Sequence, residues 1–128
     1  MTDAALILIV EDNEKNLKLV RDVLRHTGYQ TIEAGTGEDG VRLAKERGPA
    51  LILMDIQLPG IDGITALGQL RADPATRAIP VIAVTASAMT QDRKKIMAAG
   101  FDGYQTKPIR VREFMDVVRE TLDRHAPR

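Results

Sequence analysis

The feature that most constrains this chain is a strict alternation between short apolar runs and segments with helical periodicity. Leu6–Val10 is wholly apolar, and a helical pattern follows it until Gly28. Four further runs, each followed by a helical pattern, are Gln30–Ala34, Ala50–Met54, Pro80–Val84 and a short segment near Tyr104. Such alternation predicts a parallel sheet with helices on both faces, a doubly wound α/β fold.

The composition of each run indicates the order of the strands. The first, third and fourth runs are apolar throughout, as expected for central strands that are covered on both faces. The second and fifth runs are more polar or shorter, so we expect them at the edges. With right-handed crossovers this predicts the order 2-1-3-4-5. Met54 and Met97 are expected in the core.

The overall numbers exclude several classes of protein. A chain of 128 residues suits one domain, so residues 1–128 are expected to form a single domain with no output domain. The formal net charge is zero and aromatic residues make up 3%, which disfavours binding to nucleic acid. The chain has no cysteine, no apolar run of membrane-spanning length and no signal peptide, so we expect a cytoplasmic protein without membrane association.

Five polar residues follow or end strands of the predicted sheet. In the order 2-1-3-4-5 the switch point lies between the first and third strands, and ligands bind beyond the carboxyl ends of the strands there. The five residues are Glu11, Asp12, Asp55, Thr85 and Lys107. Two carboxylates about 4 Å apart repel each other by roughly 1 kcal/mol in water and about 4 kcal/mol near a protein surface. The three acids therefore predict a site for Mg²⁺ or Mn²⁺, which prefer oxygen ligands.

A carboxylate nucleophile beside a metal, a hydroxyl and a lysine suits phosphoryl transfer to Asp55. Each residue also has an ordinary interpretation. Glu11 and Asp12 could complement a helix dipole, Asp55 could be a turn residue, Thr85 a loop hydroxyl and Lys107 a solvated charge. Taken singly these interpretations are favoured, but the convergence of all five residues at one edge favours a functional site.

Four stretches of this sequence resemble the receiver domains of two-component response regulators, the CheY-like superfamily. They are LILIVEDNEKN, LILMDIQLPGIDG, IPVIAVTA and GYQTKPI, and the resemblance covers essentially the whole chain. EDNEKN and MDIQLP are most similar to single-domain regulators of the DivK type and to the receivers of hybrid histidine kinases. The resemblance implies a flavodoxin-like (βα)5 sandwich.

The resemblance also implies roles for individual residues. Asp55 is then the phosphoacceptor, and Glu11 and Asp12 bind Mg²⁺ or Mn²⁺ together with Asp55 and the backbone carbonyl of Gln57. Lys107 pairs with the phosphoryl group.

A conformational switch is implied by the same family. Thr85 is expected to hydrogen-bond the phosphoryl group, and Tyr104 is similar to the aromatic residue that moves with it. Lys107-Pro108 resembles a cis peptide of the family. Gln57 and Ser87 occupy positions that tune the lifetime of the phosphoryl group.

A family member of this kind is expected to signal rather than to turn over a substrate. It would take its phosphoryl group from a histidine kinase or a histidine phosphotransferase in a phosphorelay, and its only catalysis would be its own phosphorylation and dephosphorylation. A downstream protein would bind at the face formed by the fourth helix, fifth strand and fifth helix. We expect a monomer or a weak dimer.

Three other functions compete with this one. Gly35-Thr36-Gly37-Glu38-Asp39-Gly40 matches a dinucleotide-binding fingerprint with Asp55 20 residues beyond Gly35, but it follows a predicted edge strand and places two acids where a pyrophosphate would lie. A phosphatase with an aspartyl nucleophile needs an acid two residues after it, where this chain has Gln57. A receiver-like module that switches without phosphate would have lost an acid, the threonine or the lysine, and all are present.

Overall fold

Strands and helices alternate along the whole described chain. The computed structural model describes residues 5–86 and 90–125. The strands are β1 Leu6–Val10, β2 Gln30–Ala34, β3 Leu51–Asp55, β4 Val81–Thr85 and β5 Gly103–Thr106. The helices are α1 Glu14–Thr27, α2 Gly37–Arg47, α3 Gly63–Ala72, α4 Thr90–Ala98 and α5 Val111–Arg124. The alternation read from the sequence is therefore confirmed, with strand boundaries that differ by one residue at Ala50 and Pro80.

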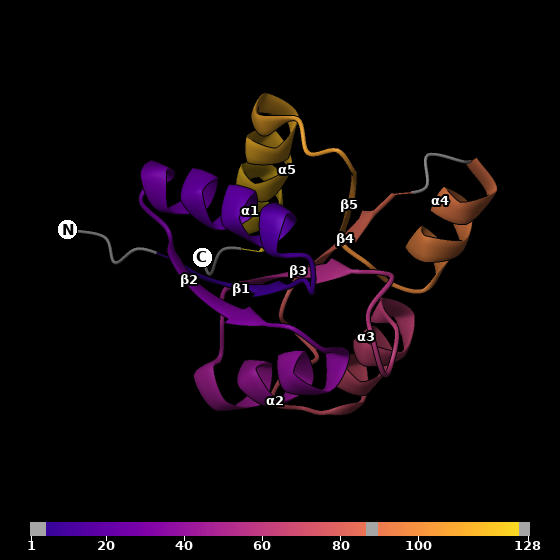
Figure 1. The fold of residues 1–128 in the computed structure, drawn as a ribbon. Helices are drawn as coiled ribbons and strands as arrows, with labels where there is room; N and C mark the ends of the chain where they lie inside the picture. The colour runs from indigo at the N-terminus through magenta and orange to yellow at the C-terminus, as the bar shows by residue number, and fades with distance from the viewer. Residues whose placement is uncertain (1–4, 87–89, 126–128) are drawn as a thin grey trace.

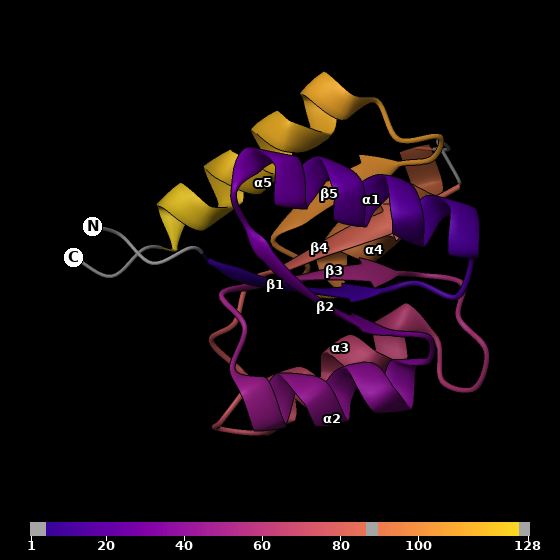
Figure 2. The ribbon, with the colours of Figure 1, turned by 60° about the vertical axis from the view of Figure 1, so that its left-hand side comes forward.

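All described strand pairs are parallel, and the sheet has the predicted order β2-β1-β3-β4-β5. Figures 1 and 2 show α1 and α5 on one face of the sheet and α2 and α3 on the other. Helix α4 belongs to the second face, because its Ile96 packs in the same cluster as residues of α2 and α3. The protein is a three-layer sandwich with a doubly wound sheet at its centre.

The core lies on both faces of the central strands. In β1, Leu8 and Val10 pack toward α2, α3 and α4, whereas Ile7 and Ile9 pack toward α1 and α5. This alternation follows from the two-residue period of a strand. Every residue of β3 and β4 is buried, while β2 and β5 are only partly buried, as expected for edge strands.

Local sequence sets where several helices begin and end. The side chains of Asn13, Thr36 and Asp62 accept hydrogen bonds from backbone N–H groups in the first turns of α1, α2 and α3. Gly28 and Gly48 end α1 and α2 in the left-handed conformation. None of the helices in the described part of the chain combines the length and hydropathy that a transmembrane span requires.

Of the two methionines expected in the core, one is buried and one is exposed. Met54 is fully buried in β3, but Met97 is 40% exposed on α4. Helix α4 has a narrow apolar face, on which Ile96 is the buried residue among those described. The prediction for Met97 is therefore wrong, because its neighbour in the chain occupies the core-facing position.

At the amino ends of β4 and β5, Asp102 holds several segments together. Its Oδ2 accepts hydrogen bonds from the Val81 N–H and from Arg71, both at 2.8 Å. Its Oδ1 lies 3.4 Å from Nε2 of His125 at the end of α5. Arg71 also donates to the carbonyls of Arg77, Ile79 and Gly100. This amino-edge network thus joins α3, β4, β5 and α5.

Candidate functional site

The sheet brings the predicted site residues to one edge. Asp55 is the last residue of β3, and Glu11 follows β1, whose Val10 pairs with Met54. Thr85 ends β4 and pairs with Thr106, directly before Lys107. Because neighbouring parallel strands end together, residues distant in the sequence meet at the carboxyl edge.

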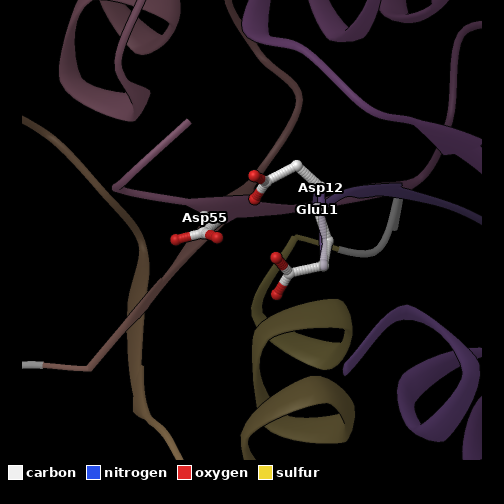
Figure 3. Close-up of side chains that lie close together, drawn as sticks. All are labelled: Glu11, Asp12 and Asp55. Atoms are coloured by element: carbon white, nitrogen blue, oxygen red, sulfur yellow. The ribbon is translucent and has the colours of Figure 1, made fainter. Parts of the chain in front are cut away.

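Three carboxylates converge there, as Figure 3 shows. One oxygen from each of Glu11, Asp12 and Asp55 lies within 4.8 Å of the other two. Glu11 and Asp55 are 5% and 4% exposed, whereas Asp12 is exposed. The site is therefore open to solvent on the Asp12 side and closed beneath the other two acids.

Lys107 joins the two buried acids. Its Nζ lies 2.8 Å from Glu11 Oε1 and 3.0 Å from Asp55 Oδ2. The remaining oxygens accept backbone hydrogen bonds: Asp55 Oδ1 from the N–H of Gln57 at 3.0 Å, and Glu11 Oε2 from the N–H of Asn13 at 3.1 Å. These contacts hold both carboxylates in fixed orientations.

The electrostatics of the site are unbalanced. Burial raises the pKa of Glu11 above its ordinary value of 4.5, and the Asp55 carboxylate raises it further, against the hydrogen bonds from Lys107 and Asn13. Burial also lowers the pKa of Lys107, but its hydrogen bonds to Glu11 and Asp55 outweigh burial and raise that pKa above 10.5. Lys107 is thus charged at neutral pH, but the cluster has one ammonium group for three carboxyl groups.

The acids fit a divalent cation. They offer hard oxygen ligands at a spacing suited to one ion, and the exposed Asp12 leaves the site accessible to water. Burial is the largest cause of the raised pKa of Glu11, and the neighbouring Asp55 adds to it, so an ionised Glu11 carries an energetic penalty in the metal-free protein. A cation of charge two would relieve it. The Gln57 N–H donates to Asp55, which places Gln57 at this edge, and the binding of metal by its carbonyl stays a prediction.

The predicted switch residues lie on β4 and β5. Thr85 is 4% exposed, and Tyr104 is half-buried against the core. The Arg93 guanidinium of α4 lies 5.3 Å from the centre of the Tyr104 ring, a cation–π contact. The Lys107-Pro108 peptide bond is cis, as expected. Ser87 lies outside the described residues.

A Cβ at Gly35 of the fingerprint-like motif would meet nothing within 4 Å, but the other two glycines, Gly37 and Gly40, pack closely against the protein. A Cβ at Gly37 would lie 2.6 Å from Ile61, and one at Gly40 would lie 2.8 Å from Val10. The motif follows β2, an edge strand. Close packing of α2 against the sheet and the loop before α3 accounts for these glycines, so the motif supplies no support for dinucleotide binding.

Sequence reasoning missed some contacts around the site. The backbone of Asn13 orients Glu11, and Arg93 stacks on Tyr104. An asparagine directly before a helical pattern is a detectable N-cap signal, but its effect on Glu11 depends on the loop geometry. The Arg93 contact joins two elements and leaves no local pattern.

Fold and site together define a class: doubly wound α/β proteins with an acidic, lysine-containing site at the switch point of the sheet. The model of the response regulator receiver domain matches residues 7–119. The chain is 46% identical to the polar-differentiation response regulator DivK of Brucella ovis over 116 residues, which is 91% of this chain and 94% of the relative. DivK of Brucella melitensis biotype 1 is similar to the same degree.

Solved structures agree. The receiver domain of sensor histidine kinase PA1611 from Pseudomonas aeruginosa PAO1, which holds a magnesium ion in its active site cleft, has a TM-score of 0.87 and 34% identity, covering 94% of this chain and 98% of that one. A CheY-like receiver domain protein from Methanospirillum hungatei has a TM-score of 0.84 and 28% identity, covering 95% and 96%. This chain belongs to the response regulator receiver domain family of two-component signalling.

Proposed function

We propose that this protein is a single-domain response regulator that accepts a phosphoryl group on Asp55 and thereby changes its contacts with other proteins. The observation that carries this proposal is the contact between the buried Asp55 and the partly buried Lys107, 3.0 Å apart, within the cluster of acids at the switch point. The 46% identity to DivK, a response regulator, supports it. The donor would be a phosphohistidine on a histidine kinase or a histidine phosphotransferase.

The chemistry is a transfer between two nucleophiles. An Asp55 carboxylate oxygen attacks the phosphorus, the new O–P bond forms as the N–P bond of the phosphohistidine breaks, and the imidazole leaves with the bonding electron pair. Lys107 is placed to neutralise charge on the transferred group, and the Gln57 N–H orients the nucleophile. Bound Mg²⁺ or Mn²⁺, held by Glu11, Asp12, Asp55 and the Gln57 carbonyl, would supply further charge neutralisation.

Phosphorylation would act on the fold through Thr85. The Asp55 carboxylate, which carries one negative charge, is replaced by an acyl phosphate whose phosphoryl group carries about −1.5 to −2 charges. A hydrogen bond from the Thr85 hydroxyl to that charge contributes roughly 1.5–3 kcal/mol, enough to shift a two-state equilibrium about ten- to a hundredfold. Movement of Thr85 toward the phosphoryl group would open space for Tyr104, whose ring now contacts Arg93.

The signal would be read at the surface of α4, β5 and α5. An open groove of about 390 Å³ lies there, and Arg93, Tyr104 and Glu113 are among the residues that line it. A change at Tyr104 would alter this groove directly. We propose that residues 1–128 act as one receiver in the cytoplasm, as a monomer or weak dimer, without catalysis beyond phosphorylation and dephosphorylation of Asp55.

The test is phosphorylation of the purified protein with Mg²⁺ and acetyl phosphate, followed by intact-protein mass spectrometry. We expect wild type to gain the mass of one phosphoryl group, Asp55→Ala to gain none, and the control Asp39→Ala to behave as wild type. If Asp55→Ala gains as much as wild type, the proposal is wrong.

A second variant tests the role of Lys107. Lys107→Ala is expected to fold and to bind Mg²⁺, but its binding to a phosphorylation-dependent partner should respond weakly to phosphorylation. A normal response of partner binding in this variant would exclude the role that we assign to Lys107.

A further inference from the structure

The loop between β3 and α3, residues 56–62, rests on the first turn of α2. The N–H of Ile61 donates to Glu38 Oε1 at 3.4 Å. Glu38 makes no ion pair with any residue in the ranges 5–86 and 90–125. The described polar contact of Glu38 is therefore with the β3–α3 loop, although the sequence alone indicates an ordinary acid in the first turn of a helix.

Gly60 shows how closely the Glu38 carboxylate approaches the loop. A Cβ on Gly60 would lie 2.6 Å from Glu38 Oε2 and 2.7 Å from Oε1. Gly60 also has a φ of 77°, in the left-handed region that other residues rarely adopt. The backbone conformation thus requires a glycine at this position, and the Glu38 carboxylate lies directly against it.

The second contact is apolar. A Cβ on Gly37 would lie 2.6 Å from Ile61 Cγ1 and 2.9 Å from the Ile61 carbonyl oxygen. Ile61 is partly buried against the core cluster. The end of the loop next to α3 is therefore fixed by packing on Gly37 and by the carboxylate of Glu38.

The end of the same loop that follows β3 carries Gln57, the candidate metal ligand. The Gln57 N–H donates to Asp55 Oδ1 at 3.0 Å, and the Gly63 N–H donates to the Ile56 carbonyl at 3.0 Å. The loop is thus held at the site by Asp55 and on its other side by α2.

We propose that Glu38 is a positioning residue: it holds the β3–α3 loop so that the Gln57 carbonyl faces a divalent cation bound by Glu11, Asp12 and Asp55. The inference rests on the proposed function, which requires that cation. Glu38 itself stays outside the metal site and acts through Gly60 and Ile61. Partners that hydrogen-bond a metal ligand directly typically affect metal affinity by about 10- to 100-fold, and Glu38, which acts through the loop, should have a smaller effect.

The test measures metal binding by the unphosphorylated full chain, with Mn²⁺ followed by electron paramagnetic resonance. Glu38→Ala is expected to lower Mn²⁺ affinity by less than about tenfold, below that range, because Glu38 acts through the loop and its hydrogen bond to Ile61 is long. Glu38→Gln keeps an oxygen acceptor and should recover most of the affinity. Asp39→Ala removes the same charge from the same helix turn and should bind Mn²⁺ as wild type does.

Amide hydrogen exchange gives a local readout that does not depend on metal. Glu38→Ala should speed exchange at the N–H of Ile61 and leave β1 and β3 unchanged, which also confirms that the variant is folded. Wild-type Mn²⁺ affinity in Glu38→Ala, or equal losses in Asp39→Ala, would overturn the inference while leaving phosphorylation of Asp55 intact. Absence of Mn²⁺ binding by wild type would instead overturn the proposed function, and this inference with it.

Discussion

Two charged clusters lie at opposite ends of the same sheet, and they are built differently. At the carboxyl edge, three acids, Glu11, Asp12 and Asp55, lie together, and one lysine, Lys107, pairs with Glu11 and Asp55. At the amino edge, one acid, Asp102, is matched by Arg71 and His125 and by a backbone N–H. The first cluster has more negative than positive charge, whereas the second has a partner for each oxygen of its acid.

The difference separates binding from stability. The polar groups of the amino-edge network pair with one another within the protein. The network therefore joins α3, β4, β5 and α5 and needs no ligand. The carboxyl-edge cluster gathers like charges that folding alone would not favour. Lys107 offsets part of its charge and a bound cation would offset more, which is the property that the proposed phosphoryl-accepting site needs. Substitutions in the two clusters should therefore have opposite effects on stability.

The largest effect is expected from Asp102→Ala. It removes the acceptor of two hydrogen bonds of 2.8 Å, from Arg71 and from the Val81 N–H. Hydrogen bonds to charged groups contribute about 1.5–3 kcal/mol each, so we expect the free energy of unfolding to fall by about 3 kcal/mol. Urea denaturation monitored by circular dichroism measures it.

The matched control is Asp123→Ala, which removes an exposed acid from α5 that has no ion-pair partner among the described residues. It should change the unfolding midpoint little. Equal stabilities of Asp102→Ala and wild type would show that the amino-edge network does not stabilise the fold.

A smaller effect of opposite sign is expected at the carboxyl edge. Asp12→Asn removes repulsion within the cluster without breaking a contact of Lys107. In metal-free buffer of low ionic strength, it should raise the free energy of unfolding by about 1 kcal/mol. Urea titration in the presence of a chelator measures this gain.

Added Mg²⁺ should reverse the order of stability of wild type and Asp12→Asn. Wild type gains about 2.7 kcal/mol when the free ion is a hundredfold above its dissociation constant, whereas Asp12→Asn has lost a ligand and gains less. If Asp12→Asn is no more stable than wild type without metal, repulsion between these acids is negligible and the contrast between the clusters disappears.

The smallest effect concerns the pH dependence that Glu11 confers. Its pKa is raised by burial and by Asp55, so its contribution to stability is fully present below its unfolded value of about 4.5 and is lost as pH rises through the raised folded value. Metal-free wild type should therefore lose stability relative to Glu11→Gln as pH rises through that window. Thermal unfolding of both proteins over this range is the measurement, and a constant difference between them would contradict the prediction.

Much of the fold could be read from the sequence because its signals are local. The apolar runs of β1, β3 and β4 predicted buried central strands, and their positions relative to the more polar runs predicted the order. Glu11, Asp12 and Asp55 could be grouped because residues at the ends of adjacent parallel strands must lie close together. Strand periodicity and strand order thus located the candidate site before any coordinate was known.

Only the tertiary structure decided which side chains meet. The sequence carries no sign that Asp102 joins Arg71 to His125, that Met97 is exposed beside the buried Ile96, or that Glu38 reaches the loop at Ile61. Each of these depends on the rotation of a helix or the path of a loop. The alternation of apolar runs with helical patterns determines the secondary structure, and the apolar or polar character of each run determines the strand order. Side-chain contacts between distant segments depend instead on how the packed layers come together.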